Sequence, residues 1–444
     1  MAETSRVAPR ALRPLRHPHY RLLAASMALS LLSAGLWTVA LVWQVVALGG
    51  GPQDLSLVVS LGAFGMLLTT LLGGVLADRV PQRHILLAVA VVQAGSTGVV
   101  AALSLAQVLA LWHLAAAGLL SGLAAGVYYP AYSALLPALL PEEELLAANG
   151  LEGALRPIFV QAGGPALAGV LVAAASPGAA LGATALAAAA SAACLLALPV
   201  TPLRRDLAAG AGTATSPVRA VLGDLAEGFR FMVRTRWLLV TLLFASGMVL
   251  AMMGPLEVLT PFAVRDRAGG GPREHALVLA AFGLGGALGS AVVASLRMPR
   301  RYLTVMTLMW GVGCVPMVVF GLSTALWPMV VAGAVAGALF NAPMVIWGTL
   351  LQRRVPPALL GRVASLDFFV SLALMPASMA LAGPAAALFG MTAVFLVAGL
   401  VPLALAVVAV VAGRLPADEI AHPLDGSASP AGCAPEPLPE AAGA

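Results

Sequence analysis

The chain has 444 residues, of which 60% are hydrophobic and 10% are charged, and its mean hydropathy is +0.96. A soluble core cannot hide that much apolar surface, so the composition excludes a soluble globular protein and requires a lipid bilayer as the solvent. The formal net charge of +5 comes entirely from arginine, because the sequence contains no lysine. Such an excess is typical of the cytoplasmic loops of membrane proteins and gives no support to a nucleic-acid partner.

The first half of the chain is predicted to form six membrane-spanning helices. A run of about 20 apolar residues crosses ~30 Å of hydrocarbon as a helix, in which the lipid-facing backbone satisfies its own hydrogen bonds. The preceding segment, 1–20, is rich in arginine and shows no cleavable signal peptide, so we expect an N-terminal cytoplasmic tail. The N-terminal bundle over 21–200 has predicted helices at 22–47, 55–77, 85–105, 108–135, 150–176 and 178–200.

The second half repeats this organisation after an arginine-rich segment. Residues 201–236 are predicted to be a cytoplasmic linker, with an amphipathic surface helix over 218–235. The C-terminal bundle over 237–412 has predicted helices at 237–263, 277–296, 302–321, 325–350, 363–389 and 391–412. The remaining residues, 413–444, are rich in Pro, Ala and Gly, and we expect them to form a disordered cytoplasmic tail.

The distribution of arginine predicts the orientation of the chain in the membrane. With both termini in the cytoplasm, all of the 24 basic residues lie on the cytoplasmic side except Arg156, within a helix, and Arg265, Arg267 and Arg273, outside. The opposite orientation would invert this ratio, against the positive-inside rule. We therefore expect a multi-pass protein of the plasma membrane, which in a bacterium is the inner membrane.

An internal repeat relates the two halves. Residues that match at one constant offset are Ala63 to Gly65 with Ala281 to Gly283, and Arg79, Pro81 and Arg83 with Arg297, Pro299 and Arg301. A second match pairs Pro141 with Pro356 and Glu152 with Asp367. The sequence thus predicts an all-α membrane protein of twelve helices in two pseudo-symmetric six-helix bundles. Such repeats place a substrate site near the membrane midplane between the halves, which rock against each other.

The loop after the second predicted helix carries a family signature. Residues 73–83 read GGVLADRVPQR, which resembles motif A of the major facilitator superfamily. Four of the matching positions are Gly74, Asp78, Arg79 and Arg83, whereas a proline and a glutamine replace two other motif residues. The resemblance implies the major facilitator fold and a gating role for these four residues. The alternative is a solvated turn held by positive-inside charge.

Further stretches are similar to the drug and siderophore exporter branch of that superfamily, which includes enterobactin exporters and macrolide-efflux proteins. They are EGFRFM at 227–232 and the loop at 351–363 that ends in Leu-Gly-Arg-Val. In the fifth predicted helix, Gly164, Pro165 and Gly169 resemble the latter part of an antiporter motif, although Val160 replaces its first glycine. Physically, the glycines allow close helix approach and the proline favours a bend, so packing without directional meaning is the alternative.

Intramembrane charges are costly and are therefore candidate functional residues. Glu152 and Arg156 have the i,i+4 spacing of a pair on one helix face, for which local neutralisation is the simpler interpretation. Glu257 follows Trp237 by about 30 Å of helix, which predicts a place at the outer mouth, as a solvated rim carboxylate or as a proton carrier.

The pseudo-symmetry predicts two related cytoplasmic latches. In one, the loop with Asp78, Arg79 and Arg83 approaches Asp367, and in the other Arg297 and Arg301 approach Glu152. Ion pairs that exist only when the inner side is closed would favour the outward-facing state. A carboxylate that binds and releases a proton would couple proton entry to latch opening, and the candidates are Asp367, Glu152 and Glu257.

Aromatic and polar residues at same-face helical spacing predict a substrate cavity for an apolar or amphipathic molecule. They are Trp37, Gln44, Tyr128, Tyr132, Phe340, Met344 and Trp347. Aromatic belts at the membrane interface and helix packing are the alternatives for each of them.

Together these features predict a secondary active transporter, not an enzyme, that exports a hydrophobic or amphipathic small molecule of the drug or siderophore class. We expect a monomer that uses proton antiport and alternating access. The histidines and cysteines form no pattern of metal ligands and no nucleotide-binding loop occurs, so no metal and no cofactor are predicted. The alternatives are a lysolipid transporter or a solute importer of the same fold and, further off, a non-transporting membrane sensor.

Overall fold

The computed structural model describes residues 10–77, 80–199 and 227–424, and every regular element in these ranges is a helix. Twelve helical spans within them are long and apolar enough to cross a membrane. Those of the N-terminal bundle are α1 (Pro18–Ala47), α2 (Pro52–Ala77), α3 (Gln82–Leu105), α4 (Leu111–Leu139), a fifth span made of α5 (Glu142–Arg156), η2 (Pro157–Gly163) and α6 (Gly164–Ala174), and α7 (Pro177–Leu196).

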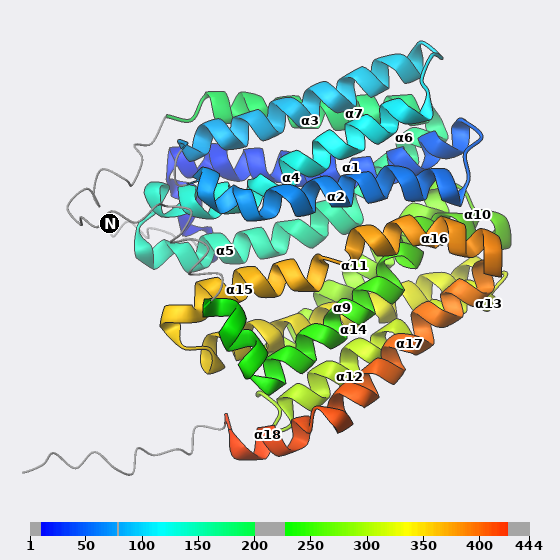
Figure 1. Ribbon diagram of the computed structural model, residues 1–444. Helices are drawn as coiled ribbons and strands as arrows, with labels where there is room; N and C mark the ends of the chain where they lie inside the picture. The colour runs from blue at the N-terminus through cyan, green and yellow to red at the C-terminus, as the bar shows by residue number, and fades with distance from the viewer. Residues whose placement is uncertain (1–9, 78–79, 200–226, 425–444) are drawn as a thin grey trace, which may run out of the picture.

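The C-terminal bundle repeats this pattern, with interruptions in three spans. Its elements are α9 (Arg236–Gly254), η4 (Pro255–Leu259) and α10 (Thr260–Ala268), then α11 (Pro272–Ser295), α12 (Tyr302–Cys314) and α13 (Met317–Leu322), α14 (Leu326–Arg354), α15 (Pro357–Leu372) and α16 (Met375–Phe389), and α17 (Met391–Ala412). Two short elements flank the bundles, the 3₁₀ helix η1 (Arg10–Arg16) and helix α18 (Leu415–Ala421). Figure 1 shows α1 to α7 above and α9 to α17 below.

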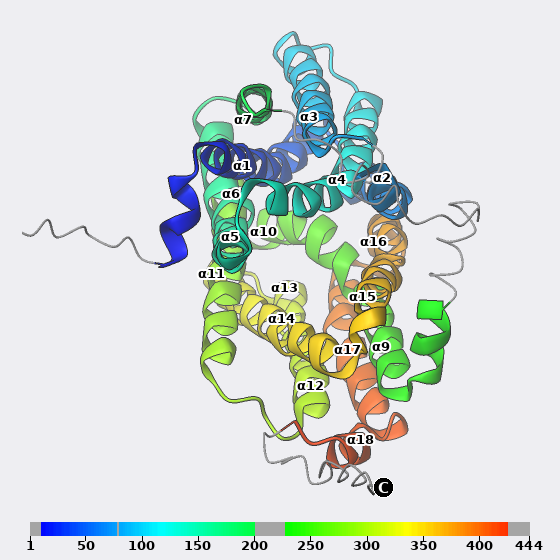
Figure 2. The same ribbon diagram turned by 90° about the vertical axis from the view of Figure 1, so that its left-hand side faces the viewer.

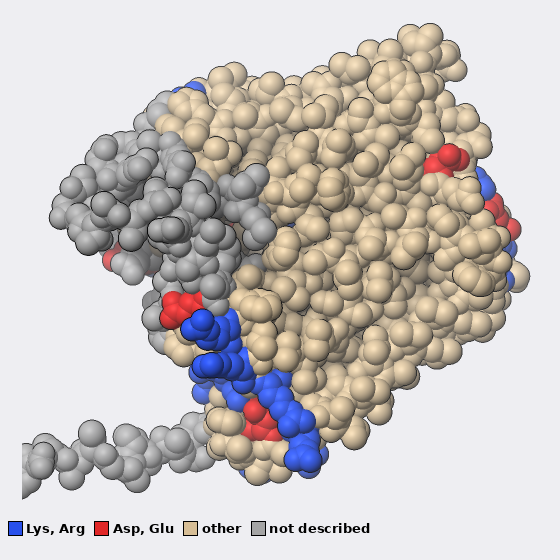
Figure 3. Space-filling model, in the orientation of Figure 1, with Lys and Arg blue, Asp and Glu red and all other residues tan. Residues whose placement is uncertain are grey.

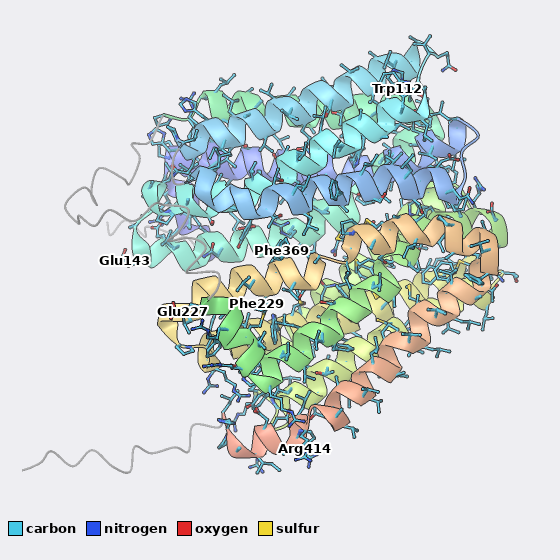
Figure 4. All side chains as sticks on the ribbon, in the orientation of Figure 1. Trp112, Glu143, Glu227, Phe229, Phe369 and Arg414 are labelled. Atoms are coloured by element: carbon cyan, nitrogen blue, oxygen red, sulfur yellow. The ribbon has the colours of Figure 1, made fainter. Side chains whose placement is uncertain are left out.

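Both ends of the described chain lie on the same side of the bundles, at the left of Figure 1, and we call this the terminus side. In Figure 4, Glu143, Glu227 and Arg414 lie on the terminus side, and Trp112 lies on the opposite side. On the face shown in Figure 3, a broad uncharged surface separates the charged residues at the two ends. This surface carries the exposed leucines and valines of the helices, as expected where lipid surrounds a protein.

The second helix of each bundle begins in the same way, which extends the sequence repeat. The Asp54 carboxylate accepts a hydrogen bond from the Gly51 backbone N–H at 2.9 Å, and Glu274 accepts one from Gly271 at 2.7 Å. A proline, which needs no hydrogen-bond partner at this position, follows each glycine. A carboxylate in the first turn also stabilises the positive end of the helix, so both halves cap this helix with the same chemistry.

Glycines bring the helices of each bundle close together. A Cβ atom on Gly122 of α4 would collide with the Gly62 carbonyl of α2, and one on Gly337 of α14 would collide with the Phe282 carbonyl of α11. Helices in lipid gain little from hydrophobic burial against each other, so close backbone contact of this kind stabilises their association.

The main contacts between the two bundles form two seams. One joins η2 and α6 to α11, and the other joins α2 to α16. Figure 2, viewed from the terminus side, shows these seams at its left and right. Helices α6 and α16 are the halves of their spans that lie toward the opposite side. The bundles therefore meet mainly there.

The boundaries differ from the sequence prediction in a few places. Helices α5 and α15 begin earlier than predicted, at Glu142 and Pro357, because reading apolar runs leaves out polar or loop-like first turns. Part of the predicted linker helix lies outside the described residues, and the described part, 227–234, is helical.

The predicted disorder of 413–444 is wrong at the start of this segment. Helix α18 packs against the C-terminal bundle, and the Glu419 carboxylate accepts hydrogen bonds from the Thr304 backbone N–H at 2.6 Å and from its hydroxyl at 3.0 Å. Composition gave no sign of these contacts, because they depend on a partner far away in the sequence. Residues 425–444 lie outside the described part.

Candidate transport site

A cavity of about 140 Å³ lies between the two bundles. Both halves of the chain line it, as the internal repeat predicts for a site at the interface between halves. The lining residues are Thr38, Val160 and Gln161 of the N-terminal bundle and Leu256, Glu257, Thr260, Val278, Leu279, Phe282, Met317, Phe320 and Gly333 of the C-terminal bundle.

Glu257 is the one charged residue among the described residues that line this cavity. Its side chain is exposed, whereas the next two residues, Val258 and Leu259, are fully buried, so the carboxylate faces the cavity. No hydrogen bond or ion pair to this carboxylate occurs among the described residues. Thr38, Gln161 and Thr260 add neutral polar groups, and the rest of the lining is apolar.

Two wide helical turns position two of the polar side chains of the cavity. Gln161 lies in the π-helix η2 and Glu257 in the π-helix η4. Each π-helix begins at a proline, which lacks the N–H that would continue the regular α-helical pattern. A π-turn inserts an extra residue and changes the direction of the side chains around it, and such turns are frequent at functional sites.

The structure corrects the predicted depth of Glu257. The sequence prediction ended this helix at 263, whereas α10 continues it to Ala268. Eleven residues separate Glu257 from that end, which corresponds to about 16 Å of helix. The carboxylate therefore lies inside the protein, and the prediction of a place at the outer mouth is wrong.

The antiporter-like glycines lie at two close contacts. A Cβ atom on Gly164 would lie 2.7 Å from the Gly35 Cα atom of α1, and the Gly35 Cβ would collide with the carbonyl of Phe159. A Cβ atom on Gly169 would lie 2.9 Å from the Pro272 carbonyl oxygen of α11, across the seam between the bundles. Pro165 packs beside Gly35 at the first contact. Close helix packing next to the π-helix η2 is thus what these residues provide.

The C-terminal bundle repeats both contacts. A Cβ atom on Gly254 would collide with the Ser378 carbonyl, just as a Cβ atom on Gly35 would collide with the Phe159 carbonyl in the N-terminal bundle. A Cβ atom on Gly383 of α16 would lie 2.6 Å from the Gln53 Cα atom of α2, and the Gly383 backbone N–H donates to the Ser56 hydroxyl at 2.8 Å. Each seam therefore has one glycine set against the first turn of a helix in the other bundle.

The motif A-like loop is only partly described. Gly74 falls within α2, and Asp78 and Arg79 lie outside the described residues. Arg83 donates to the backbone carbonyls of Leu195 at 2.9 Å and Leu196 at 2.8 Å. Arg83 thus caps the negative end of α7 in its own bundle.

Among the described residues, no predicted latch pair is formed in this conformation. Glu152 is buried and pairs with Arg156 at 3.0 Å, which is the local neutralisation that their spacing allowed. Asp367 accepts hydrogen bonds from the Trp347 indole at 2.9 Å and from the Ser371 hydroxyl at 3.3 Å. Arg297 and Arg301 are exposed on the terminus side of the C-terminal bundle. Glu152 and Asp367, the described latch carboxylates, are therefore each satisfied within their own bundles.

Two predicted cavity residues are buried in the N-terminal bundle instead. Gln44 is 5% exposed and accepts a hydrogen bond from the Ser104 hydroxyl of α3 at 2.7 Å. Tyr132 is 1% exposed, and its ring stacks on that of Tyr128 with centroids 6.1 Å apart. Trp37 packs against the hydrophobic core. Same-face spacing identified one side of each helix, but that side faces a neighbouring helix.

The three predicted cavity residues of α14, Phe340, Met344 and Trp347, are not among the lining residues. Trp347 is buried in a cluster with Trp237 and Trp310, and Met344 is exposed. The Phe340 ring packs against that of Phe282, a true lining residue, with centroids 6.4 Å apart. Sequence reasoning missed Thr38, Gln161, Thr260, Phe282 and Phe320, and the one available signal was the pair of prolines, Pro157 and Pro255, inside long apolar runs.

Twelve spans in two repeated bundles around a shared cavity define a secondary transporter of the major facilitator fold. The chain belongs to the family described as "Transmembrane secretion effector" within the major facilitator superfamily, whose family model matches residues 9–434. It is accordingly a membrane transporter and not an enzyme.

Relatives in this family carry names of efflux proteins. The chain is 30% identical over 391 residues to the multidrug efflux pump Tap of Mycolicibacterium fortuitum, a match that covers 86% of this chain and 92% of the relative. It is also 30% identical over 360 residues to the enterobactin exporter EntS of Shigella boydii, which covers 79% and 81%. Among solved structures, the nucleoside transporter NupG has the same fold, with a TM-score of 0.70 at 13% identity over 89% of this chain and 99% of that chain.

Proposed function

We propose that this protein exports hydrophobic or amphipathic small molecules from the cell by alternating access, coupled to proton antiport. The observation that carries this proposal is the position of the cavity, which both bundles line while their main contacts lie on the opposite side. The names of the relatives, a multidrug efflux pump and an enterobactin exporter, support the outward direction.

The terminus side is proposed to face the cytoplasm of a bacterial cell, with the protein in the inner membrane. Most arginines belong to that side, whereas the opposite side holds Arg265, Arg267 and Arg273. Positive charge is retained on the cytoplasmic side of membrane proteins. With this orientation the structure corresponds to an inward-facing state, in which the outer side is closed by the two seams.

The complementary outward-facing state requires new contacts on the cytoplasmic side. We assign that closure to the motif A-like residues, with Asp78, Arg79 and Arg83 approaching Asp367, and with Arg297 and Arg301 approaching Glu152. To move a two-state balance from 1:99 to 99:1 takes about 5.5 kcal/mol, which several partly buried ion pairs supply in part. Glu152 and Asp367 would then exchange their present partners, Arg156 and Trp347, for partners in the other bundle.

Glu257 is the proposed proton carrier. A carboxylate within a membrane span is costly when it is charged and unpaired. A switch of the cavity from one side of the membrane to the other can therefore make the carboxylate bind or release a proton. Glu152 and Asp367 are weaker candidates because each already has a hydrogen-bonding partner. One chain contains the whole cavity, so a monomer suffices for this cycle.

Everted membrane vesicles test the proposal. An acid-inside gradient is imposed, a pH dye is followed, and siderophores, macrolides, cationic dyes and lysolipids are added in turn. We expect proton release from the vesicles with at least one compound, absent in vesicles without the protein. The Glu257→Gln variant should abolish this release, because a neutral amide cannot exchange a proton, whereas Glu143→Gln, at an exposed position, should retain it.

Two results would contradict the proposal. Silence of the wild-type protein across the panel would point to import or uncoupled flux, and a lysolipid as the one active compound would point to lipid transport. Proton release by Glu257→Gln at the wild-type rate would remove Glu257 from the coupling step.

A further inference from the structure

The central cavity has a negative group and no positive one. Among the residues that the structure describes, Glu257 lines it and no arginine does. The other polar lining residues, Thr38, Gln161 and Thr260, are neutral and offer acceptor oxygens as well as donors. A carboxylate removed from bulk water is costly unless it is neutralised or paired. In this cavity the group that neutralises the carboxylate or pairs with it, a proton or an organic cation, has to come from outside the described lining.

The remaining lining suits the apolar part of a small organic ion. Phe282 and Phe320 come from α11 and α13, and aliphatic side chains or Met317 fill most of the wall. Aromatic faces attract organic cations, and this attraction increases when water is excluded. The volume of about 140 Å³ is close to that of an engineered cavity of about 150 Å³ in another protein that binds benzene. One ring or one substituted ammonium group therefore fits.

The two π-turns bring one polar side chain from each bundle to the cavity. Gln161 lies on η2 of the N-terminal bundle and Glu257 on η4 of the C-terminal bundle. The Gln161 Cβ atom also lies close to Gly283 of α11, which fixes η2 against the other bundle. A ligand held between Gln161 and Glu257 would thus contact both halves, and a change in the angle between the halves would alter its site.

We propose that this cavity selects amphipathic monocations, and that the Glu257 carboxylate is the counter-ion for their positive group. This inference rests on the proposed function, since it names the substrate class of the same cavity. Anionic compounds are disfavoured by the same geometry, because they would place a second negative charge beside an unpaired carboxylate. Of the drug and siderophore classes, the inference therefore favours cationic drugs over polyanionic siderophores.

Equilibrium binding to the purified full-length protein in lipid nanodiscs tests this inference without reference to transport. The probe is tritiated N-methylpyridinium, a one-ring permanent cation whose charge does not titrate. Its competitors are toluene, which has nearly the same shape and no charge, and benzoate, which carries the opposite charge. We expect the cation to bind the wild-type protein and both competitors to displace it at least tenfold less well than the unlabelled cation does.

Variants identify the group that binds the cation. Glu257→Gln keeps the shape of the side chain and should raise the Kd for the cation at least tenfold, whereas Glu257→Asp keeps the charge and should have a smaller effect. Glu143→Gln, an exposed carboxylate on the terminus side, should bind as the wild type does. Monodisperse elution of each variant in size-exclusion chromatography shows that the fold is retained.

Three results would overturn the inference: no binding of the cation to the wild-type protein, equal binding of the cation and the carboxylate, or a wild-type Kd in Glu257→Gln. The two proposals fail separately. Loss of proton release in Glu257→Gln with unchanged cation affinity would reject the counter-ion and leave the exporter. Cation binding that depends on Glu257, without proton release in vesicles, would reject proton antiport and leave the cation site.

Discussion

The two sides of the molecule differ in the residues that lie there: glycines pack across the seams on the opposite side, and charged side chains lie on the terminus side. On the opposite side, Gly169 and Gly383 place backbone against backbone across the seams. On the terminus side, the charged groups Arg83, Glu152 and Asp367 find partners within their own bundles. Steric fit thus closes one side, and the other side holds charges that can exchange partners.

This difference has a physical consequence for a protein that alternates between two states. Contact between close-packed backbones is lost sharply with distance, because dispersion attraction falls off within about an ångström. Ion pairs act over several ångströms and also depend on the solvent. A seam of glycines therefore behaves as an all-or-none contact, whereas the charges on the terminus side can begin to attract each other before the bundles meet.

The largest expected effect comes from filling a glycine of the seam. A Cβ atom on Gly383 would lie 2.6 Å from the Gln53 Cα and 2.7 Å from the Gln53 backbone nitrogen, with no flexible atom to move away. Gly383→Val should therefore prevent closure of the opposite side and lower the transport rate at least tenfold. A matched control is Gly182→Val, since a Cβ atom on Gly182 meets no heavy atom within 4 Å.

Accessibility measurements separate this effect from misfolding. In a background without the native cysteines, Thr38→Cys places a thiol in the cavity, where an impermeant maleimide added from the opposite side reacts when that side is open. Gly383→Val should raise the labelling rate at unchanged membrane abundance. Transport and labelling equal to those of Gly182→Val would show that the seam does not need glycine.

A smaller effect is expected on the terminus side, where charges replace steric fit. Asp78→Asn should lower transport severalfold without lowering membrane abundance, because the proposed closure on this side loses one charge and keeps the others. The comparison variant is Asp266→Asn, whose carboxylate forms an exposed pair with Arg265 on the opposite side. If Asp78→Asn transports as well as Asp266→Asn does, the motif A-like loop has no gating role.

The sequence predicted most of the fold because the fold depends on features that are local in the chain. Apolar runs identified all twelve spans, and the repeat of Ala63 to Gly65 at Ala281 to Gly283 identified the two bundles. The same reasoning failed at residues 415–421, where a short polar segment is helical because Glu419 binds Thr304. A contact between distant segments leaves no periodic signal.

The site was harder to predict for a similar reason. A helix in a bundle presents several faces to neighbours, and spacing alone does not say which face meets the cavity. Gln44 and Tyr132 were assigned to the wrong surroundings on that basis. Glu257 was identified as a residue of interest, but its depth was misjudged because a straight helix was measured from one end. The π-turns, which bring Gln161 and Glu257 to the cavity, depend on prolines inside the spans.

The smallest expected effect distinguishes the cavity predicted from the sequence from the one observed. Gln44→Met removes an amide that accepts a hydrogen bond from Ser104 inside the N-terminal bundle and does not belong to the lining. It should cost about 1 kcal/mol of stability and leave the substrate affinity within twofold of the wild type. Gln161→Met makes the same change in the cavity and should alter the affinity two- to fivefold, because an amide there can contact the substrate. Binding titrations and thermal unfolding of both variants measure the two effects. A shift in affinity for Gln44→Met but not for Gln161→Met would restore the face of α1 as the substrate site and reject the cavity around Glu257.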